Sequence, residues 1–304
     1  MSKPRRFHRD VNGILLLDKP LGISSNAALQ QARVLFSAVK AGHAGSLDPL
    51  ASGLLPVCFG QATKVCGRLL NSGKTYRVVV ELGARTESGD CETEIIERAA
   101  VPELTQMQVD AVLATFVGPQ QQIPPMHSAL KFEGKRLYEL ARRGESVERQ
   151  PRSIVIHRLE RVGLEPDRLE FDVYCSKGTY IRTLAADIAQ RLGTLGYVKG
   201  LRRLSLDPFG GLKMHTMEEL AAHAEQARDA LLLAADAAFV DLPDVALDAP
   251  AVRSLLQGQS VSVAGRSAVG EMRAYDRDGR FLGIVEGQPD GRVKPARLFV
   301  PVVP

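Results

Sequence analysis

The stretch from Gly42 to Lys64 reads GHAGSLDPLASGLLPVCFGQATK and holds a single carboxylate, that of Asp48. A glycine-rich turn over residues 42–46 precedes this acid, and Pro49 follows it. Glycine reaches backbone conformations that other residues adopt only at a cost, and proline favours an extended conformation in the residue before it. The pattern therefore predicts a rigidly held, exposed acid with His43 five residues upstream. Such an acid suits a nucleophile or general base, although Asp-Pro is also a common way to open a turn.

This stretch resembles the signature of the bacterial tRNA pseudouridine-55 synthases, the TruB family. In that family the Asp of G-x-L-D-P-x-A-x-G-x-L is the catalytic carboxylate, and Asp48 occupies that place here. Further segments resemble the motifs of the family in the same order, namely residues 13–25, 74–90, 125–138, 175–182 and 201–203. The resemblance covers most of residues 10–210.

The resemblance assigns roles to single residues. It implies that Asp48 is catalytic, that Tyr76 stacks on the flipped base, and that Arg182 is the counter-ion of Asp48. Asp90 is expected to share that arginine, and His43 to take part in extruding the base or in filling the space it leaves. Tyr180 and Leu201 match positions that line the uracil pocket. Expected phosphate contacts are Lys19, Lys64, Lys131 and the pairs Arg142-Arg143 and Arg202-Arg203.

Length and composition set limits on the class of protein. The chain has 304 residues, of which 45% are hydrophobic and 24% charged, as expected for a globular protein. No apolar run approaches the roughly 20 residues of a membrane helix, and no secretory signal follows the basic N-terminus. The four scattered cysteines are expected to be reduced thiols in the cytoplasm. The histidines and cysteines show no metal-ligand spacing, and no nucleotide-binding fingerprint is present, so neither a metal nor a cofactor is expected.

Charge is segregated along the chain. Residues 128–161 hold nine Lys or Arg against five acids, residues 196–213 four against one, and the first ten residues four against one. Residues 217–248, by contrast, hold eight acids against one Arg. Several basic segments in one chain favour a polyanionic partner. Together with the resemblance, this predicts binding to the T-arm of tRNA, with no membrane partner, and we expect a monomer.

The order of elements predicts an α+β fold. Residues 13–17 and 75–82 read as strands, a helix follows Ser24 or Ser25, and residues 181–192 carry a helical apolar stripe. The resemblance implies a mixed, largely antiparallel sheet with flanking helices in a catalytic domain over residues 1–245, with a basic insertion at about 119–152. Residues 241–250 read as a linker, and residues 250–304 as a small all-β module, resembling the PUA-like RNA-binding domain, that binds RNA or only stabilises the core.

The predicted reaction is the isomerisation of uridine to pseudouridine at position 55 in the TΨC loop. It breaks the N1–C1′ bond and makes a C5–C1′ bond, so it adds no atom and needs no cofactor. Attack of Asp48 at C1′, removal of the C2′ proton and addition at C6 all remain open. Two other functions are considered: a tRNA-folding chaperone in which catalysis is secondary, and a small-molecule hydrolase that uses Asp48 and His43.

Overall fold

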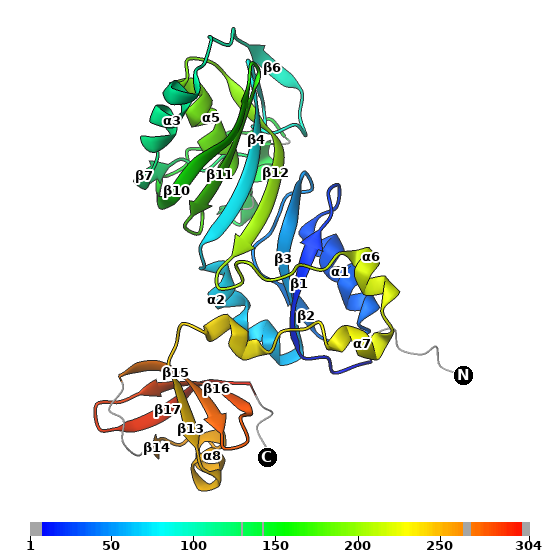
Figure 1. Cartoon of the computed structure of the whole chain (residues 1–304), viewed down its shortest axis with the longest axis vertical. Helices are drawn as coiled ribbons and strands as arrows, with labels where there is room; N and C mark the ends of the chain where they lie inside the picture. Colours follow the sequence, from blue (N-terminus) through cyan, green and yellow to red (C-terminus); the bar gives the residue numbers. More distant parts are fainter. Residues whose placement is uncertain (1–7, 129, 142, 264–268, 300–304) are drawn as a thin grey trace.

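The computed structural model describes residues 8–128, 130–141, 143–263 and 269–299. It contains a large sheet that carries the pocket described below and, at the other end of the molecule, a smaller C-terminal sheet (Figure 1). No helix in the described part of the chain is long and apolar enough to cross a membrane.

The large sheet has eight strands. Seven follow the order β1-β3-β12-β4-β11-β10-β7, and the short β2 pairs with β3. Only the β3–β12 pairing is parallel, which confirms the expectation of a mixed, largely antiparallel sheet. The strands are β1 (Gly13–Lys19), β2 (Ala41–His43), β3 (Ala51–Phe59), β4 (Lys74–Leu82), β7 (Gly118–Gln122), β10 (Arg152–Glu165), β11 (Arg168–Cys175) and β12 (Gly196–Leu206).

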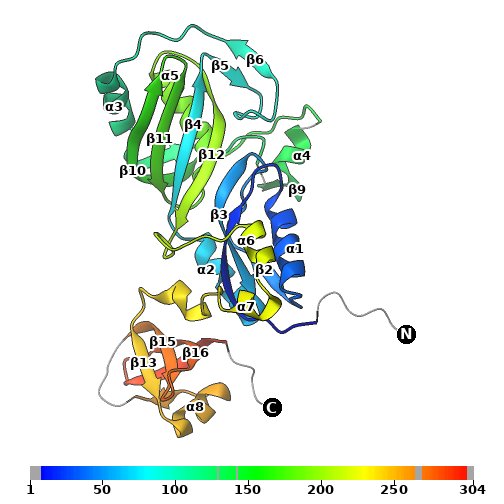
Figure 2. The ribbon, with the colours of Figure 1, turned by 45° about the vertical axis from the view of Figure 1, so that its right-hand side comes forward.

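Helices cover one face of each half of this sheet. Helices α5 (Ile181–Arg191) and α3 (Gln106–Ala114) pack on the half formed by β4, β10, β11 and β12. On the other half, α1 (Ser25–Leu35) and α6 (Met217–Ala222) lie together against β1 and β3 (Figure 2). Shorter elements complete the domain: η1 (Gly60–Val65), α2 (Cys66–Leu70), β5 (Ala84–Thr86), β6 (Ile95–Arg98), β8 (Lys131–Phe132), β9 (Lys135–Arg136), α4 (Leu137–Ala141), α7 (Glu225–Asp229) and η2 (Ala235–Phe239).

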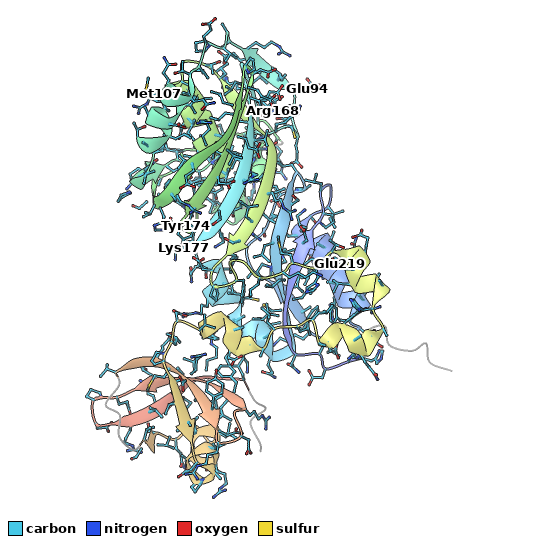
Figure 3. The ribbon with its side chains drawn as sticks, in the orientation of Figure 1. Glu94, Met107, Arg168, Tyr174, Lys177 and Glu219 are labelled. Carbon is cyan, nitrogen blue, oxygen red and sulfur yellow. The ribbon has the colours of Figure 1, made fainter. Side chains whose placement is uncertain are left out.

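The opposite face of the β4–β11 pair carries polar side chains. Residues alternate between the two faces of a strand, and along β4 every second side chain is buried. The guanidinium of Arg77 donates two hydrogen bonds of 2.9 Å to Asp172 on this open face. Tyr174 and Lys177 lie at one end of β11, and Arg168 lies at the other (Figure 3). The apolar core therefore lies on the helix side of the sheet.

The close approach of β3 and β12 depends on a glycine. Gly53 has a φ of +97°, and a Cβ there would lie 2.2 Å from the backbone oxygen of Arg203. Only glycine fits at such a distance in this conformation. The contact brings the start of β3, which follows the Asp48 turn, beside Leu201 and Arg203 of β12.

The second sheet starts earlier than expected and is not purely β. Residues 241–250, predicted as a linker, contain β13 (Asp244–Leu247), which pairs with β15 (Gly270–Asp276). Asp248 then caps α8 (Ala249–Leu256) through the Ala251 amide. The remaining strands are β14 (Val261–Ser262), β16 (Phe281–Gly287) and β17 (Arg292–Leu298), in the order β13-β15-β16-β17-β14. A turn at Asp278-Gly279 joins β15 to β16.

The smaller sheet packs directly on the part of the chain that forms the large sheet. Phe239 of η2 lies 6.0 Å from Phe299 and 6.4 Å from Phe281, measured between ring centroids. All three belong to one apolar cluster with residues of β1 and β3. Because this core continues across the junction, the C-terminal module is attached by apolar packing as well as by its linker.

The predicted basic insertion is shorter than residues 119–152. Its first residues form β7, which pairs with β10 at the edge of the large sheet. Arg152 already belongs to β10. The segment that leaves the sheet therefore lies between Gln122 and Arg152, where it carries the small β8–β9 hairpin and α4.

Candidate active site

Asp48 stands on a turn that is held by backbone and side-chain hydrogen bonds. The hydroxyl of Ser25 accepts a hydrogen bond from the Leu47 amide (2.7 Å) and donates one to the Leu47 carbonyl (2.9 Å). The Ala51 amide donates to the backbone oxygen of Asp48 at 3.0 Å. These contacts fix the residues on both sides of Asp48, whose side chain is 49% exposed.

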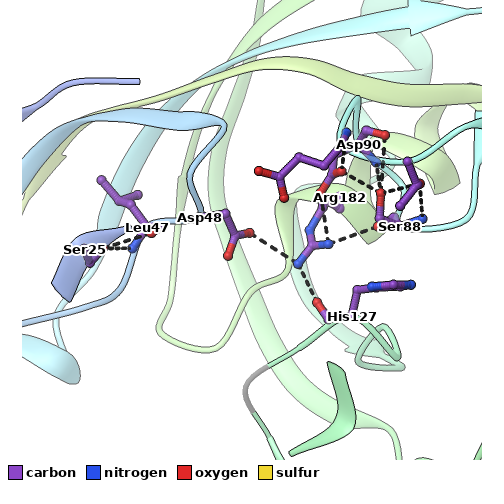
Figure 4. A network of polar contacts seen from close by, with 9 residues as sticks. Ser25, Leu47, Asp48, Ser88, Asp90, His127 and Arg182 are labelled. Carbon is purple, nitrogen blue, oxygen red and sulfur yellow. Dashed lines mark hydrogen bonds and ion pairs between the residues drawn. The ribbon is translucent and has the colours of Figure 1, made fainter. Parts of the chain in front are cut away.

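Arg182 connects this turn to a second acid. One guanidinium nitrogen, Nη2, lies 3.3 Å from Oδ2 of Asp48, and Nη1 lies 3.0 Å from Oδ2 of Asp90 (Figure 4). The same two nitrogens donate to the backbone oxygens of His127 at 2.6 Å and Ser88 at 3.0 Å. Since the arginine side chain is only 11% exposed, these partners fix its position beside Asp48.

Asp90 and Glu92 add negative charge around this arginine. Asp90 is 1% exposed and accepts hydrogen bonds at Oδ1 from the Ser88 hydroxyl (2.5 Å) and the Glu92 amide (3.0 Å). Burial raises the pKa of Glu92, and the charges of Asp90 and Asp48 raise it further. Asp48 is thus the only acid in its stretch of sequence, but in the folded chain it lies among three carboxyl groups near one guanidinium. Sequence reasoning missed Glu92.

A pocket of about 210 Å³ opens beside Asp48. Five of the predicted site residues line it together, and the structure adds Ser128 and Thr179 among its polar groups. The predicted lining residues are Asp48, Tyr76, Tyr180, Arg182 and Leu201. The pocket thus combines two aromatic rings, an aliphatic side chain and a carboxylate paired with a guanidinium.

The wall residue Tyr180 is held by a side chain that sequence reasoning did not identify. Gln122, which is buried at the end of β7, accepts a hydrogen bond from the Tyr180 amide at 2.7 Å. Its side-chain amide donates back to the Tyr180 carbonyl at 3.0 Å. Since a two-point contact of this kind imitates a strand pairing, it fixes the backbone just before Arg182. Gln122 and Tyr180 are 58 residues apart in the sequence, so no local pattern could have revealed this contact.

His43 lies near the pocket without lining it. It ends β2, where it pairs with Val57 of β3. Its Nδ1 is buried and has no hydrogen-bond partner among the described residues. Burial lowers the pKa of His43, and the positive charge of Arg203 lowers it further. The imidazole is therefore held in its neutral form in the Gly-rich turn.

Two of the expected phosphate contacts are buried instead. Lys19 is fully buried, and its ammonium donates to the carbonyls of Pro20 (2.8 Å) and Ile23 (2.7 Å). Arg203 is also fully buried, because β12 lies between β3 and β4 and turns this side chain beneath the Asp48 turn. Neither cation is accessible to a phosphate, so these two predictions are wrong.

Other predicted contacts are engaged elsewhere or lie outside the described residues. The Lys64 ammonium donates to the Leu298 carbonyl at 2.7 Å and so joins η1 to β17 of the smaller sheet. Arg202 forms a two-point ion pair with Asp18 at 2.7 and 2.9 Å, although its side chain stays 40% exposed. Arg142 and the side chain of Lys131 lie outside the described part of the chain.

The described residues include no group of three or more His, Cys, Asp or Glu side chains able to hold a metal ion. All four cysteines are free thiols. The polar groups of the pocket are instead an acid–arginine–acid array, hydroxyls and aromatic rings. Such a site suits nucleophilic or acid–base chemistry on an uncharged ring.

Comparison with known proteins identifies the family. Residues 33–181 match the N-terminal domain of TruB family pseudouridylate synthases, and residues 182–240 match the tRNA pseudouridylate synthase B C-terminal domain. Residues 243–299 match the C-terminal domain of pseudouridine synthase II TruB. The chain is 49% identical over 295 residues to the tRNA pseudouridine synthase B of Methylobacillus flagellatus, covering 97% of both chains. It is 47% identical to that of Pseudomonas putida, covering 98% of this chain and 99% of the relative.

Solved structures support the same fold at lower identity. A Cbf5-Nop10-Gar1 complex matches with a TM-score of 0.73 at 23% identity, covering 95% of this chain and 85% of the other. An H/ACA RNP bound to a substrate RNA containing 2′-deoxyuridine matches with a TM-score of 0.71 at 19% identity, covering 99% and 93%. The fold, the three domain matches and the near full-length relatives agree, and the chain belongs to the TruB family of pseudouridylate synthases.

Proposed function

We propose that this chain isomerises uridine to pseudouridine at position 55 in the TΨC loop of tRNA, with the Asp48 carboxylate as the nucleophile. The observation that supports it most is the contact of 3.3 Å between Asp48 and Arg182 at the mouth of a pocket lined by Tyr76 and Tyr180. The two relatives described above, both tRNA pseudouridine synthases B, indicate the same reaction class.

Each residue that lines the pocket is proposed to have its own role in the reaction. A uridine stacked in a loop has to be flipped out before its glycosidic bond can be reached. The ring of Tyr76 offers a stacking partner, a contact worth about 1–3 kcal/mol per base. Leu201 and Tyr180 enclose the flipped base on the other sides and exclude water from it. The apolar part of the pocket then binds the uracil, and the polar part faces the ribose.

Arg182 holds Asp48 in place for the reaction. A guanidinium does not lose its proton in proteins and makes charge-assisted contacts with carboxylates. Asp90 holds the other side of Arg182, so the arginine cannot turn away without leaving a buried carboxylate unpaired. The pair therefore presents an oriented carboxylate oxygen to the ribose.

In the direct route, an Asp48 oxygen bonds to C1′ as the N1–C1′ bond breaks. The freed uracil turns, C5 bonds to C1′, and the carboxylate leaves. The C5 proton is then lost and N1 gains one, so the product is an isomer of the substrate. No cofactor is required, because no atom is added and no electron is gained or lost overall.

The T-arm of tRNA is the proposed partner, and the chain is proposed to act as a monomer in the cytoplasm, where tRNA is modified. Exposed basic residues of the segment between β7 and β10, together with the C-terminal module, are the proposed backbone contacts. Phosphate contacts position an RNA without reading its sequence, so we assign the choice of uridine to the pocket.

The test is single-turnover conversion of a T-stem–loop RNA by the wild-type chain and by Asp48→Asn, with RNA binding measured in parallel. We expect Asp48→Asn to bind RNA within a few-fold of wild type and to form no pseudouridine. Asp167→Asn, an exposed acid-to-amide change in the β10–β11 turn, is the matched control and should behave as wild type. Product formation by Asp48→Asn at the wild-type rate would refute the role of Asp48, and a wild-type chain that only binds would favour a chaperone.

A further inference from the structure

Two positive side chains are buried behind the pocket without an acidic partner. Lys74 begins β4 and is 8% exposed, and Arg203 in β12 is fully buried. The Lys74 ammonium donates to the carbonyls of Ser72 (2.6 Å) and Leu70 (3.3 Å). Within the described part of the chain, no acid forms an ion pair with either cation.

Both cations lie directly behind residues that line the pocket. Arg203 pairs across the sheet with Tyr76, and Lys74 lies on the same face of β4, two residues before that tyrosine. A Cβ on Gly45 would lie 3.2 Å from Nη1 of Arg203 and 3.6 Å from Cε of Lys74. Gly45 directly precedes the lining residue Ser46, so both cations pack against the backbone that carries the pocket wall.

Arg203 also ties together the parts that carry the site. Its Nε donates to the Leu54 carbonyl of β3 at 2.6 Å, and its Nη2 donates to the Gly45 carbonyl at 2.8 Å. The positive charge is thus held at a fixed place beneath the Asp48 turn and cannot reorient toward water. A fixed charge in a region of low dielectric acts strongly on charge that forms nearby.

Burying these two cations without an acidic partner lowers the stability of the fold, so packing alone does not account for them. A buried charge that has only neutral hydrogen-bond partners is unfavourable compared with the same charge in water. Burial, and then the charge of Arg203, lower the pKa of Lys74 to about 8. The negative charge of Asp207 raises the pKa of Lys74 but only partly offsets this decrease, and the positive charge of Lys177 lowers the pKa further. Cys175, whose pKa is raised to about 11 by burial, stays neutral beside it at neutral pH.

We propose that Lys74 and Arg203 stabilise, through space, the negative charge that the uracil carries when its bond to the ribose is broken. When N1–C1′ breaks, the electron pair of the bond stays on the base and spreads over N1, O2 and O4. The same pair then forms the C5–C1′ bond, so the charge exists only between substrate and product. In the direct route this charge passes from the Asp48 carboxylate to the base and returns when the carboxylate leaves. A positive potential behind Tyr76, the ring on which the base is proposed to stack, favours the intermediate by acting on the charge while it is on the base.

The proposal rests on the proposed function and predicts a distinctive pH dependence for Lys74. We would measure single-turnover rates on the T-stem–loop RNA from pH 6.5 to 9.5 for the wild type, Lys74→Met, Lys74→Gln and Lys74→Arg. At pH 7 the two uncharged variants should be slower by about tenfold, an effect expected for one charge acting through the pocket wall. Their RNA affinity should stay within twofold of wild type, because the charge acts on the intermediate alone.

The wild-type rate should fall as the pH rises through about 8 and approach that of Lys74→Met, as Lys74 loses its proton. Lys74→Arg should lose this fall, since arginine keeps its charge, and if the longer side chain prevents folding, Lys74→Met and Lys74→Gln still decide the matter. Wild-type rates and an unchanged pH profile in both uncharged variants would overturn the proposal while leaving the proposed function intact. A wild-type chain that makes no pseudouridine would overturn both.

Discussion

Replacing Lys74 by methionine should make the fold more stable, and by an amount that depends on pH. The pKa of Lys74 falls from 10.5 to about 8 in the folded chain, and one pKa unit corresponds to about 1.36 kcal/mol. Holding the lysine charged in the fold therefore costs about 3 kcal/mol below pH 8. Methionine removes that cost but leaves the carbonyls of Leu70 and Ser72 without this donor, at about 1 kcal/mol each. A net gain of about 1 kcal/mol at pH 7 follows.

The sign of the pH dependence follows from proton binding. Between about pH 8 and 10.5 the unfolded chain holds the Lys74 proton and the folded chain does not. Stability of the wild type therefore rises with pH in this window, relative to a variant that lacks the group. Between pH 7 and 9.5 the wild type should gain about 2 kcal/mol on Lys74→Met, which reverses the order of the two proteins.

Urea unfolding of both proteins at pH 7, 8, 9 and 9.5 measures this directly. Taking the difference between the two cancels the other groups that titrate in the same range. Lys199→Met removes an exposed lysine of β12 that is not among the charges that shift the pKa of Lys74, and it serves as the control whose difference from wild type should not change with pH. If the difference in unfolding free energy between wild type and Lys74→Met is constant from pH 7 to 9.5, the conclusion that Lys74 carries a buried, unpaired charge is refuted.

Three further outcomes test other parts of the structure. Asp90→Asn should lower the melting temperature and reduce turnover at least tenfold, because breaking a buried ion pair costs about 3–5 kcal/mol; an unchanged melting curve would contradict the burial of Asp90 beside Arg182. Gly53→Ala should yield no folded protein by circular dichroism, since its Cβ would lie 2.2 Å from a backbone oxygen, whereas Gly67→Ala, with open space around it, should fold normally. RNA affinity should fall steeply with salt in a binding titration, and an affinity independent of salt would favour the small-molecule hydrolase.

Sequence reasoning located the parts of the site that lie in local motifs. Asp48 in its Gly-rich turn and Tyr76 on an alternating strand both follow from short patterns and from the family resemblance. The same reasoning foresaw a shared arginine, and the structure has Arg182 between Asp48 and Asp90. Local patterns succeed here because they determine backbone conformation and the face on which a side chain lies.

Contacts between residues far apart in the sequence could not be predicted in this way. Glu92 reaches the site from the β5–β6 loop and Gln122 from the end of β7, and both meet the start of α5 only in the folded chain. No spacing in the sequence indicates that these segments come together. Lys64 was expected on the RNA surface, yet its ammonium bonds to the C-terminal module, whose position against η1 the sequence does not state.

The amino-acid sequence by itself determined the family, the proposed catalytic carboxylate and the alternating strands, because each depends on residues that are neighbours along the chain. Only the tertiary structure decided which charged side chains are exposed to solvent. Lys19 and Arg203 look like surface cations in the sequence, and both are fully buried. For Arg203 the reason is the strand order: β12 lies between β3 and β4, and this side chain points beneath the Asp48 turn instead of toward solvent. For Lys19 it is the chain after β1, whose Pro20 and Ile23 carbonyls accept hydrogen bonds from its ammonium.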